Sequence, residues 1–89
     1  MQKKRRKLNK DFEKKIYSSR KNVELVLAKI YDIDDEDIQK EYMSAFKEVV
    51  YFYDELKQDY EQEGFNENSE KLLIDYKNGF NLFKSEFEI

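Results

Sequence analysis

Carboxylates, lysines and tyrosines are the side chains of this sequence that could do acid-base chemistry, and three arginines add fixed positive charge. Cysteine and histidine are both absent, which excludes Cys-His and Ser-His nucleophilic catalysis and a zinc site built on those ligands. There is also no glycine-rich phosphate loop, and the acidic residues are spread along polar helix faces instead of meeting as a catalytic pair. We therefore expect no enzymatic activity, no cofactor and no metal.

The acidic run over residues 32–37 (DIDDED) is the best candidate for a calcium loop. If that loop began at Asp32, its sixth position would be Asp37, where a glycine is needed for the turn. Its twelfth position would be Met43, where a bidentate glutamate is needed. Carboxylates in this place would instead cap the following helix and offset the positive end of its dipole. We interpret the run as a helix cap.

Positive charge is concentrated at the start of the chain. Residues 1–22 have a charge balance of +8, so the remainder must have −11 for the net charge to be −3. Basic side chains on an arm can neutralise phosphates with little sequence specificity. The candidate nucleic-acid-binding residues are Lys3, Lys4, Arg5, Arg6, Lys7, Lys10, Lys14, Arg20 and Lys21. No helix-turn-helix pattern accompanies them. The alternatives are an anionic membrane, the acidic part of the same chain or of a second copy, or no partner.

Tyrosines and carboxylates together form a second candidate surface, on the longest predicted helix, residues 34–62. Most aromatic residues at helical spacing belong to a core. Tyr51 and Tyr60 are predicted at the edges of the apolar arc, among acidic residues, and that composition is typical of a surface that binds a basic partner. The candidate partner-binding residues are Glu48, Tyr51, Asp54, Glu55, Asp59 and Tyr60.

Three helical segments must position these side chains, because proline is absent and glycine occurs only twice. The first helix, about residues 9–31, has a heptad-like apolar seam and Asn9 as its N-cap. The second, about 34–62, has two adjacent apolar stripes and so needs two neighbours. These stripes are Ile38, Tyr42, Ala45, Val49, Phe52 and Leu56, and Met43, Phe46, Val50 and Tyr53. The third, about 69–88, continues through Gly79. Asn66, Asn68 and Ser69 are each acceptable N-caps for it, and Ser69 is favoured because it is closest to the first apolar residues.

Short connections between these helices predict antiparallel neighbours. We expect an all-α protein with a flexible basic arm over residues 1–7 and a single helical domain over residues 8–89, folded as an up-down-up three-helix bundle. The alternative is a helical hairpin completed by homodimerisation, because the first and third apolar stripes are close to heptad-like. On the third helix, Ile74, Leu82 and Ile89 lie away from the main stripe.

No apolar run reaches the roughly 20 residues that would cross a bilayer, and no apolar segment follows the basic start as in an export signal. We expect a cytoplasmic protein without integral membrane association. Lysine outnumbers arginine 14 to 3, which is typical of AT-rich genomes and indicates a low-GC bacterium, or a phage or plasmid within one.

These observations favour a non-enzymatic module that binds and modulates a partner protein with a basic surface, through the acidic aromatic face of the second helix. In size and composition the chain resembles antitoxins, bacteriocin immunity proteins and phage-encoded inhibitors of host enzymes, although it contains no motif of those families. The alternative is a small nucleic-acid-associated regulator that uses the basic arm, or an acidic mimic of DNA. A homodimer is a further alternative.

Overall fold

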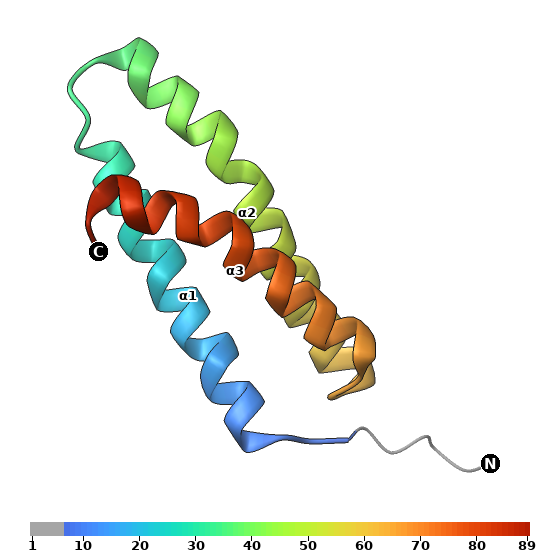
Figure 1. Ribbon diagram of the computed structural model, residues 1–89. Coiled ribbons are helices and arrows are strands. Elements are labelled where there is room, and N and C mark those ends of the chain that lie inside the picture. The colour runs from blue at the N-terminus through green and yellow to red at the C-terminus, as the bar shows by residue number, and fades with distance from the viewer. Residues whose placement is uncertain (1–6) are drawn as a thin grey trace.

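The computed structural model describes residues 7–89, which form three helices joined by short connections (Figure 1). Helix α1 spans Lys10–Tyr31, α2 spans Glu36–Glu63 and α3 spans Glu67–Phe87. Each helix packs against the other two, so the predicted all-α, up-down-up three-helix bundle is confirmed. The core is complete without the second copy that the hairpin alternative required. Of the predicted basic arm, only Lys7 lies within the described residues.

Hydrogen bonds made by polar side chains stabilise the connection between α1 and α2. The Asp35 carboxylate accepts hydrogen bonds from the backbone N–H groups of Asp37 (2.9 Å) and Ile38 (3.1 Å), which confirms the capping role of the acidic run. At the other end of the connection, the side-chain amide of Gln39 donates to the backbone carbonyls of Ile30 and Tyr31, both at 3.2 Å. These are carbonyls that the last turn of α1 leaves without helical partners.

A glycine and an asparagine shape the connection between α2 and α3. Gly64 ends α2 with a φ of 78°, a backbone conformation that a side chain would strain. Of the three acceptable N-caps, Asn66 caps α3 and accepts from the Ser69 N–H at 3.0 Å, so the preference for Ser69 is wrong. The Ser69 hydroxyl in turn accepts from the Asn66 N–H at 2.9 Å. This reciprocal capping box needs both residues, so α3 begins two residues before the predicted start at 69.

The core between the three helices consists mainly of aliphatic and aromatic side chains, and it also contains buried hydroxyl groups. Its buried apolar members are Phe12, Val23, Val26, Ile30, Phe46, Val49, Tyr53, Leu56, Tyr60, Leu73, Tyr76, Phe80 and Phe83. Ser19 is buried among them, and its hydroxyl donates to the Lys15 carbonyl at 2.8 Å. The Tyr76 hydroxyl donates to the Ser19 carbonyl at 3.1 Å, so α3 is hydrogen-bonded to α1 across the core. Burial raises the pKa of Tyr76 to about 12.

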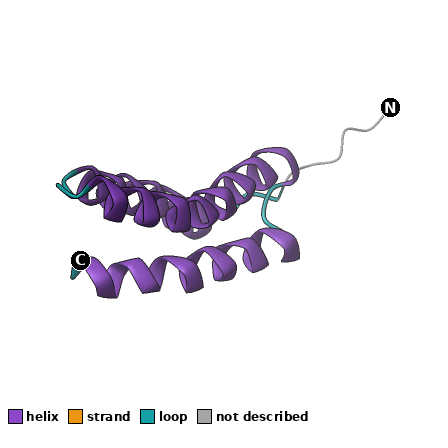
Figure 2. Ribbon diagram, turned by 90° about the horizontal axis from the view of Figure 1, so that it is seen from above, coloured by secondary structure: helices purple, strands orange, loops and turns teal. Residues whose placement is uncertain are grey.

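Helix α3 crosses the α1–α2 pair at an angle (Figure 1) and forms a separate layer beside it (Figure 2). It runs without a break through Gly79, as the sequence predicted. At this position α3 comes so close to α2 that a Cβ on Gly79 would lie 3.0 Å from Cγ2 of Val49. One turn further along, the rings of Phe46 and Phe83 pack edge to face at 4.8 Å. The missing side chain thus allows the two helices to approach closely at this position.

Candidate functional site

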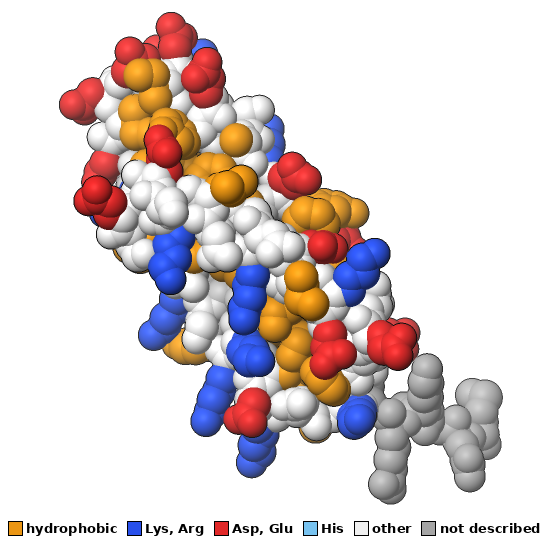
Figure 3. Space-filling view, in the orientation of Figure 1, with side chains coloured by type: hydrophobic (Ala, Val, Ile, Leu, Met, Phe, Trp, Pro, Cys, Tyr) orange, Lys and Arg blue, Asp and Glu red, His pale blue; other side chains and the backbone are white. Residues whose placement is uncertain are grey.

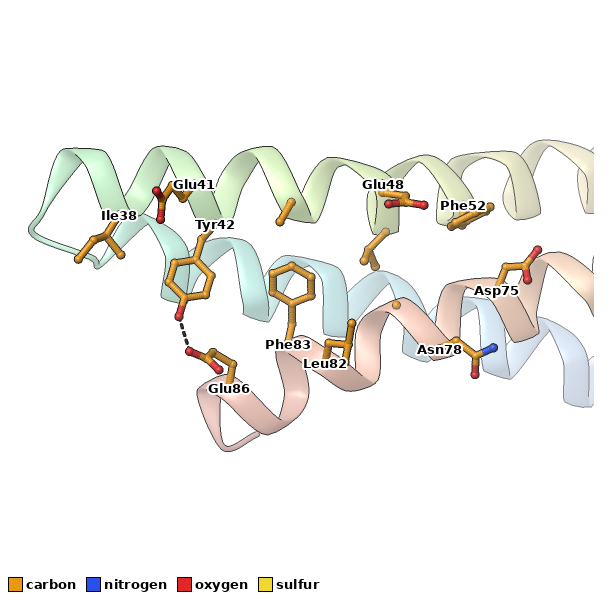
Figure 4. Close-up of a pocket in the computed structure, with 13 residues that line it drawn as sticks. Ile38, Glu41, Tyr42, Glu48, Phe52, Asp75, Asn78, Leu82, Phe83 and Glu86 are labelled. Atoms are coloured by element: carbon orange, nitrogen blue, oxygen red, sulfur yellow. Dashed lines mark hydrogen bonds between the residues drawn. The ribbon is translucent and has the colours of Figure 1, made fainter.

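A groove of about 990 Å³ lies between the N-terminal half of α2 and the C-terminal half of α3 (Figure 4). Its α2 wall is formed by Ile38, Glu41, Tyr42, Ala45, Glu48, Val49 and Phe52. Its α3 wall is formed by Asp75, Asn78, Gly79, Leu82, Phe83 and Glu86. Buried Val49 and Phe83 form the floor, and Phe83 points from α3 towards α2.

Much of the apolar surface of the groove is uncovered. Ile38 is 44% exposed and Leu82 is 73% exposed, while Ala45 is also exposed and Tyr42 and Phe52 are half-buried. The sequence predicted Ile38 and Ala45 as core positions of the first α2 stripe, and this is wrong. Because α3 crosses α2 at an angle, it covers the C-terminal part of that stripe and leaves the N-terminal part open.

Carboxylates surround the apolar part of the groove. Glu41 and Glu48 lie on the α2 wall and Asp75 and Glu86 on the α3 wall, and within residues 7–89 no lysine or arginine is among the lining. Hydrophobic side chains gather between α2 and the C-terminal half of α3 with acidic side chains around them (Figure 3). The groove is therefore apolar at its centre and negative at its edges.

One hydrogen bond closes the end of the groove near the C-terminus of α3. The Tyr42 hydroxyl donates to the Glu86 carboxylate across the two walls (Figure 4). This bond, together with the negative charge of Glu86, raises the pKa of the Tyr42 hydroxyl. The ring of Tyr42 also lies 5.3 Å from that of Phe87. The residues at this end therefore join α2 to the last turn of α3.

The predicted acidic aromatic face of α2 is only partly a surface. Tyr51 is 58% exposed and Asp54 is exposed, whereas Glu55 is half-buried. The Tyr51 ring packs edge to face, at 5.8 Å, on Phe52, which lines the groove. Glu48 belongs to the groove itself. Of these four predicted residues, Glu48 lines the groove and Tyr51 borders it, whereas Asp54 and Glu55 are not part of its lining.

The other two residues of that face have structural roles. The prediction of a surface ring at Tyr60 is wrong, because its side chain is buried and lies 5.6 Å from the ring of Phe12. Its hydroxyl accepts from the Asn9 N–H at 3.0 Å. The Asp59 carboxylate accepts from the side-chain amides of Asn66 (3.0 Å) and Asn68 (3.1 Å), and so it holds the connection between α2 and α3.

The predicted nucleic-acid-binding residues do not converge on one site. Lys3, Lys4, Arg5 and Arg6 lie outside the described residues, while Lys10 and Lys14 are exposed on α1. The Lys7 carbonyl accepts from the Phe65 N–H at 2.6 Å, which anchors the start of the described chain beside the end of α2. Arg20 pairs with Glu24 at 3.3 Å, and the Lys21 ammonium lies 5.0 Å from the centre of the Tyr17 ring. Basic side chains line α1 (Figure 3).

Some residues of the groove carry signals in the sequence and others do not. Leu82 lies away from the main stripe of α3, as predicted, and so does Ile74, which is 57% exposed outside the groove. The third member of that set, Ile89, packs against the core instead. Spacing could also have placed Tyr60, since Phe46, Tyr53 and Tyr60 are seven residues apart and all three are buried.

Comparisons with protein-family models, with curated proteins and with solved structures give no match to this chain. Among residues 7–89, no helix is long and apolar enough to span a membrane. The same residues contain no group of three or more acidic side chains placed to hold a metal ion.

Proposed function

We propose that this chain is a non-enzymatic protein-interaction module that binds a partner protein in the groove between α2 and α3 and thereby modulates the partner. The observation that supports this proposal is the uncovered apolar surface of the groove with carboxylates at its edges. This binding surface lies on a different side of α2 from the face predicted from the sequence, and the two overlap only in part. It keeps Glu48, has Tyr51 at its border, and excludes Asp59 and Tyr60.

Burial of this apolar surface by a partner would favour binding. Monomeric proteins rarely expose large contiguous apolar patches, and such patches commonly mark binding sites. Complete burial of one exposed leucine side chain is worth about 1.5–3 kcal/mol. Leu82 alone would therefore contribute roughly 1–2 kcal/mol to binding, given its 73% exposure. Ile38, Ala45 and Phe52 would add smaller amounts of the same sign.

The chemistry of the groove supports binding in preference to catalysis. Its ionisable groups are carboxylates at the edges and Tyr42, whose hydroxyl already donates to one of those carboxylates. A nucleophile beside a base, or two carboxylates sharing a buried cleft, would have supported a reaction. An apolar floor with a charged rim is instead the common composition of a protein-binding surface.

Two variants of α3 test this proposal. Leu82→Asp places a charge in the groove, and Ile74→Asp places the same charge at an exposed leucine-sized position outside it. Both side chains are exposed, so both variants should keep the helical circular dichroism and the melting temperature of the parent within a few degrees. We expect the parent and Ile74→Asp to retain a stoichiometric protein from a lysate of the source cells, and Leu82→Asp to lose it.

Two other results would contradict binding in the groove. If Leu82→Asp retains the partner and a double change of Tyr51→Lys and Asp54→Lys loses it, the binding surface is the outer edge of α2 and the groove proposal is wrong. If neither change affects retention, both surfaces are excluded. Asp59 is left unchanged in this experiment because its loss would disturb the connection between α2 and α3.

A further inference from the structure

We infer that the occupant of the groove is an amphipathic helix of about four turns, supplied by another protein, with an apolar stripe flanked on both sides by lysine or arginine. This inference rests on the proposed function and specifies the chemistry of the partner. It follows from the length of the groove, the helical nature of its two walls and the position of its carboxylates.

The length of the groove sets the length of the occupant. Along α2 the lining extends from Ile38 to Phe52, fourteen residue steps, or about 21 Å at 1.5 Å per residue. Along α3 it extends from Asp75 to Glu86, eleven steps, or about 16 Å. A helix of four turns has about the same length as the longer wall.

The walls favour a helix over an extended strand. Both are α-helices, whose backbone N–H and C=O groups are satisfied within each helix, so the groove offers no free backbone edge to which a strand could add. What it offers is a channel between two helices, into which a third helix can place side chains at positions i, i+3, i+4 and i+7. Ile38, Phe52 and Leu82 would contact that apolar stripe.

The carboxylates predict the charge of the flanks. Glu41 and Glu48 are two turns apart on one wall, and Asp75 and Glu86 are three turns apart on the other. The two helices are antiparallel, so Glu86 lies at the same end as Glu41, as its hydrogen bond to Tyr42 shows, and Asp75 lies near Phe52. A helix in the groove therefore meets carboxylates along both of its sides. Lysine and arginine suit these positions, because their stems cover apolar surface while their charges reach the rim.

The same charges argue against a second copy of this chain as the occupant. In a two-fold symmetric dimer formed groove to groove, the four carboxylates of one copy would face the same four of the other. A second copy could instead present the exposed face of α1 around Tyr17, Lys21 and Leu25. That contact joins two different surfaces, so it would build a ring or an open-ended assembly whose size grows with concentration, and not a two-fold dimer.

The basic arm of the chain itself does not fit either. Its anchor, Lys7, is bonded to Phe65 just beyond the end of α2, and Phe65 is thirteen residues along the chain from Phe52 at the nearest end of the groove. The segment Lys3 to Lys7 also contains no apolar side chain for the floor of the groove. A segment with positive charge and no apolar stripe could pair with the carboxylates at the rim but could not cover the apolar floor.

Three synthetic peptides of about eighteen residues test the inference against the full chain. The first is a helix-forming peptide with a leucine stripe flanked by lysines. The second has the same stripe flanked by glutamates. The third has the composition of the first in an order that removes the stripe. Binding is measured by fluorescence anisotropy of labelled peptide at low and at physiological salt, with Leu82→Asp and Ile74→Asp as the groove variant and its control.

We expect the lysine-flanked peptide to bind at least about tenfold more tightly than the glutamate-flanked one, because several exposed ion pairs change from attraction to repulsion. Physiological salt should weaken its binding severalfold. Leu82→Asp should weaken it about tenfold and Ile74→Asp by less than about twofold. A double change of Glu41→Lys and Glu48→Lys leaves two positive and two negative charges at the rim, so it should abolish the preference between the two flanked peptides.

Other outcomes separate the inference from the proposed function. Equal binding of the two stripe-bearing peptides, lost in Leu82→Asp, would overturn the basic occupant and leave the groove as a protein-binding site. Equal binding of the first and third peptides would overturn the helical occupant, since charge alone would then suffice. If no peptide binds and the cellular partner survives Leu82→Asp, both proposals are wrong. Concentration-dependent assembly of the parent that Leu82→Asp abolishes would make a second copy the occupant.

Discussion

Replacing Gly79 with alanine tests the packing of α2 on α3, because two opposing terms act at this residue. A glycine in the interior of a helix is less favourable than alanine by about 0.5–1 kcal/mol, so the change alone would stabilise α3. The new Cβ would, however, lie 3.0 Å from Cγ2 of Val49. Val49 is 3% exposed, and as a β-branched residue in a helix it has one strongly preferred rotamer, so it cannot turn away freely.

The cost of the contact with Val49 should exceed the gain in helix propensity. Adding a methyl group to a filled core typically costs about 1–3 kcal/mol. We therefore expect Gly79→Ala to lower the free energy of unfolding by about 1 kcal/mol. In a Val49→Ala background the clash is absent, and the same change should raise the free energy of unfolding by about 0.5–1 kcal/mol. The coupling between the two positions would then be about 1–3 kcal/mol.

Urea unfolding followed by far-ultraviolet circular dichroism measures all four proteins of this cycle. A change of about 1 kcal/mol should move the midpoint of unfolding by about 0.5–1 M, with the slope unchanged. The sign of the Gly79→Ala effect should reverse between the two backgrounds. If Gly79→Ala stabilises the parent by the full helix-propensity term and shows no coupling to Val49, the two helices do not approach closely at this position.

Three further perturbations address the buried hydroxyls and the caps. Burial raises the pKa of Tyr76 to about 12 from an ordinary value of 10.0, which means that the folded state favours the neutral hydroxyl. This preference contributes fully to the free energy of unfolding below pH 10, and the contribution is lost as the pH rises to about 12. Denaturation at a series of pH values should show that Tyr76→Phe loses roughly 1–2 kcal/mol less of its free energy of unfolding than the parent over this range. An equal loss would contradict burial of the hydroxyl. Asn66→Ala removes the cap of α3 and a hydrogen bond to Asp59, and it should lower the free energy of unfolding by about 1–2 kcal/mol. The control Asn68→Ala should lower it by less than about 0.5 kcal/mol. If urea unfolding shows the same loss for both variants, the capping box is excluded. Tyr60→Phe leaves the Asn9 N–H without its partner and should cost about 1 kcal/mol in the same assay, whereas Tyr51→Phe should be neutral; a neutral Tyr60→Phe would mean that its hydroxyl is not bonded there.

Local interactions made most of the helix boundaries predictable. A helix end depends on a few neighbouring residues, and the roles of Asn9 and Gly64 follow from their side chains and their place beside an apolar pattern. The start of α3 shows where this reasoning is insufficient. Asn66 and Ser69 are both good N-caps, and the capping box uses both, so only the path of the backbone decides which residue begins the helix.

Burial of individual residues on α2 required the tertiary structure. Tyr51 and Tyr60 have similar acidic neighbours, yet one is exposed and the other is covered by Phe12 of α1. A helical pattern shows which residues share a face, and it does not show how far a neighbouring helix extends over that face. The seven-residue spacing from Tyr53 to Tyr60 indicates the buried position, but the identity of its neighbour comes from packing.

The sequence by itself determined that this protein is helical, that it folds into three antiparallel helices, and that its acidic and basic residues are segregated along the chain. These properties depend on periodicity, turn residues and composition, which are local. The groove is a property of the tertiary structure alone. Ile38, Ala45 and Leu82 become its lining because α3 crosses α2 closely at Gly79 and then at an angle, and that crossing results from the packing of all three helices together.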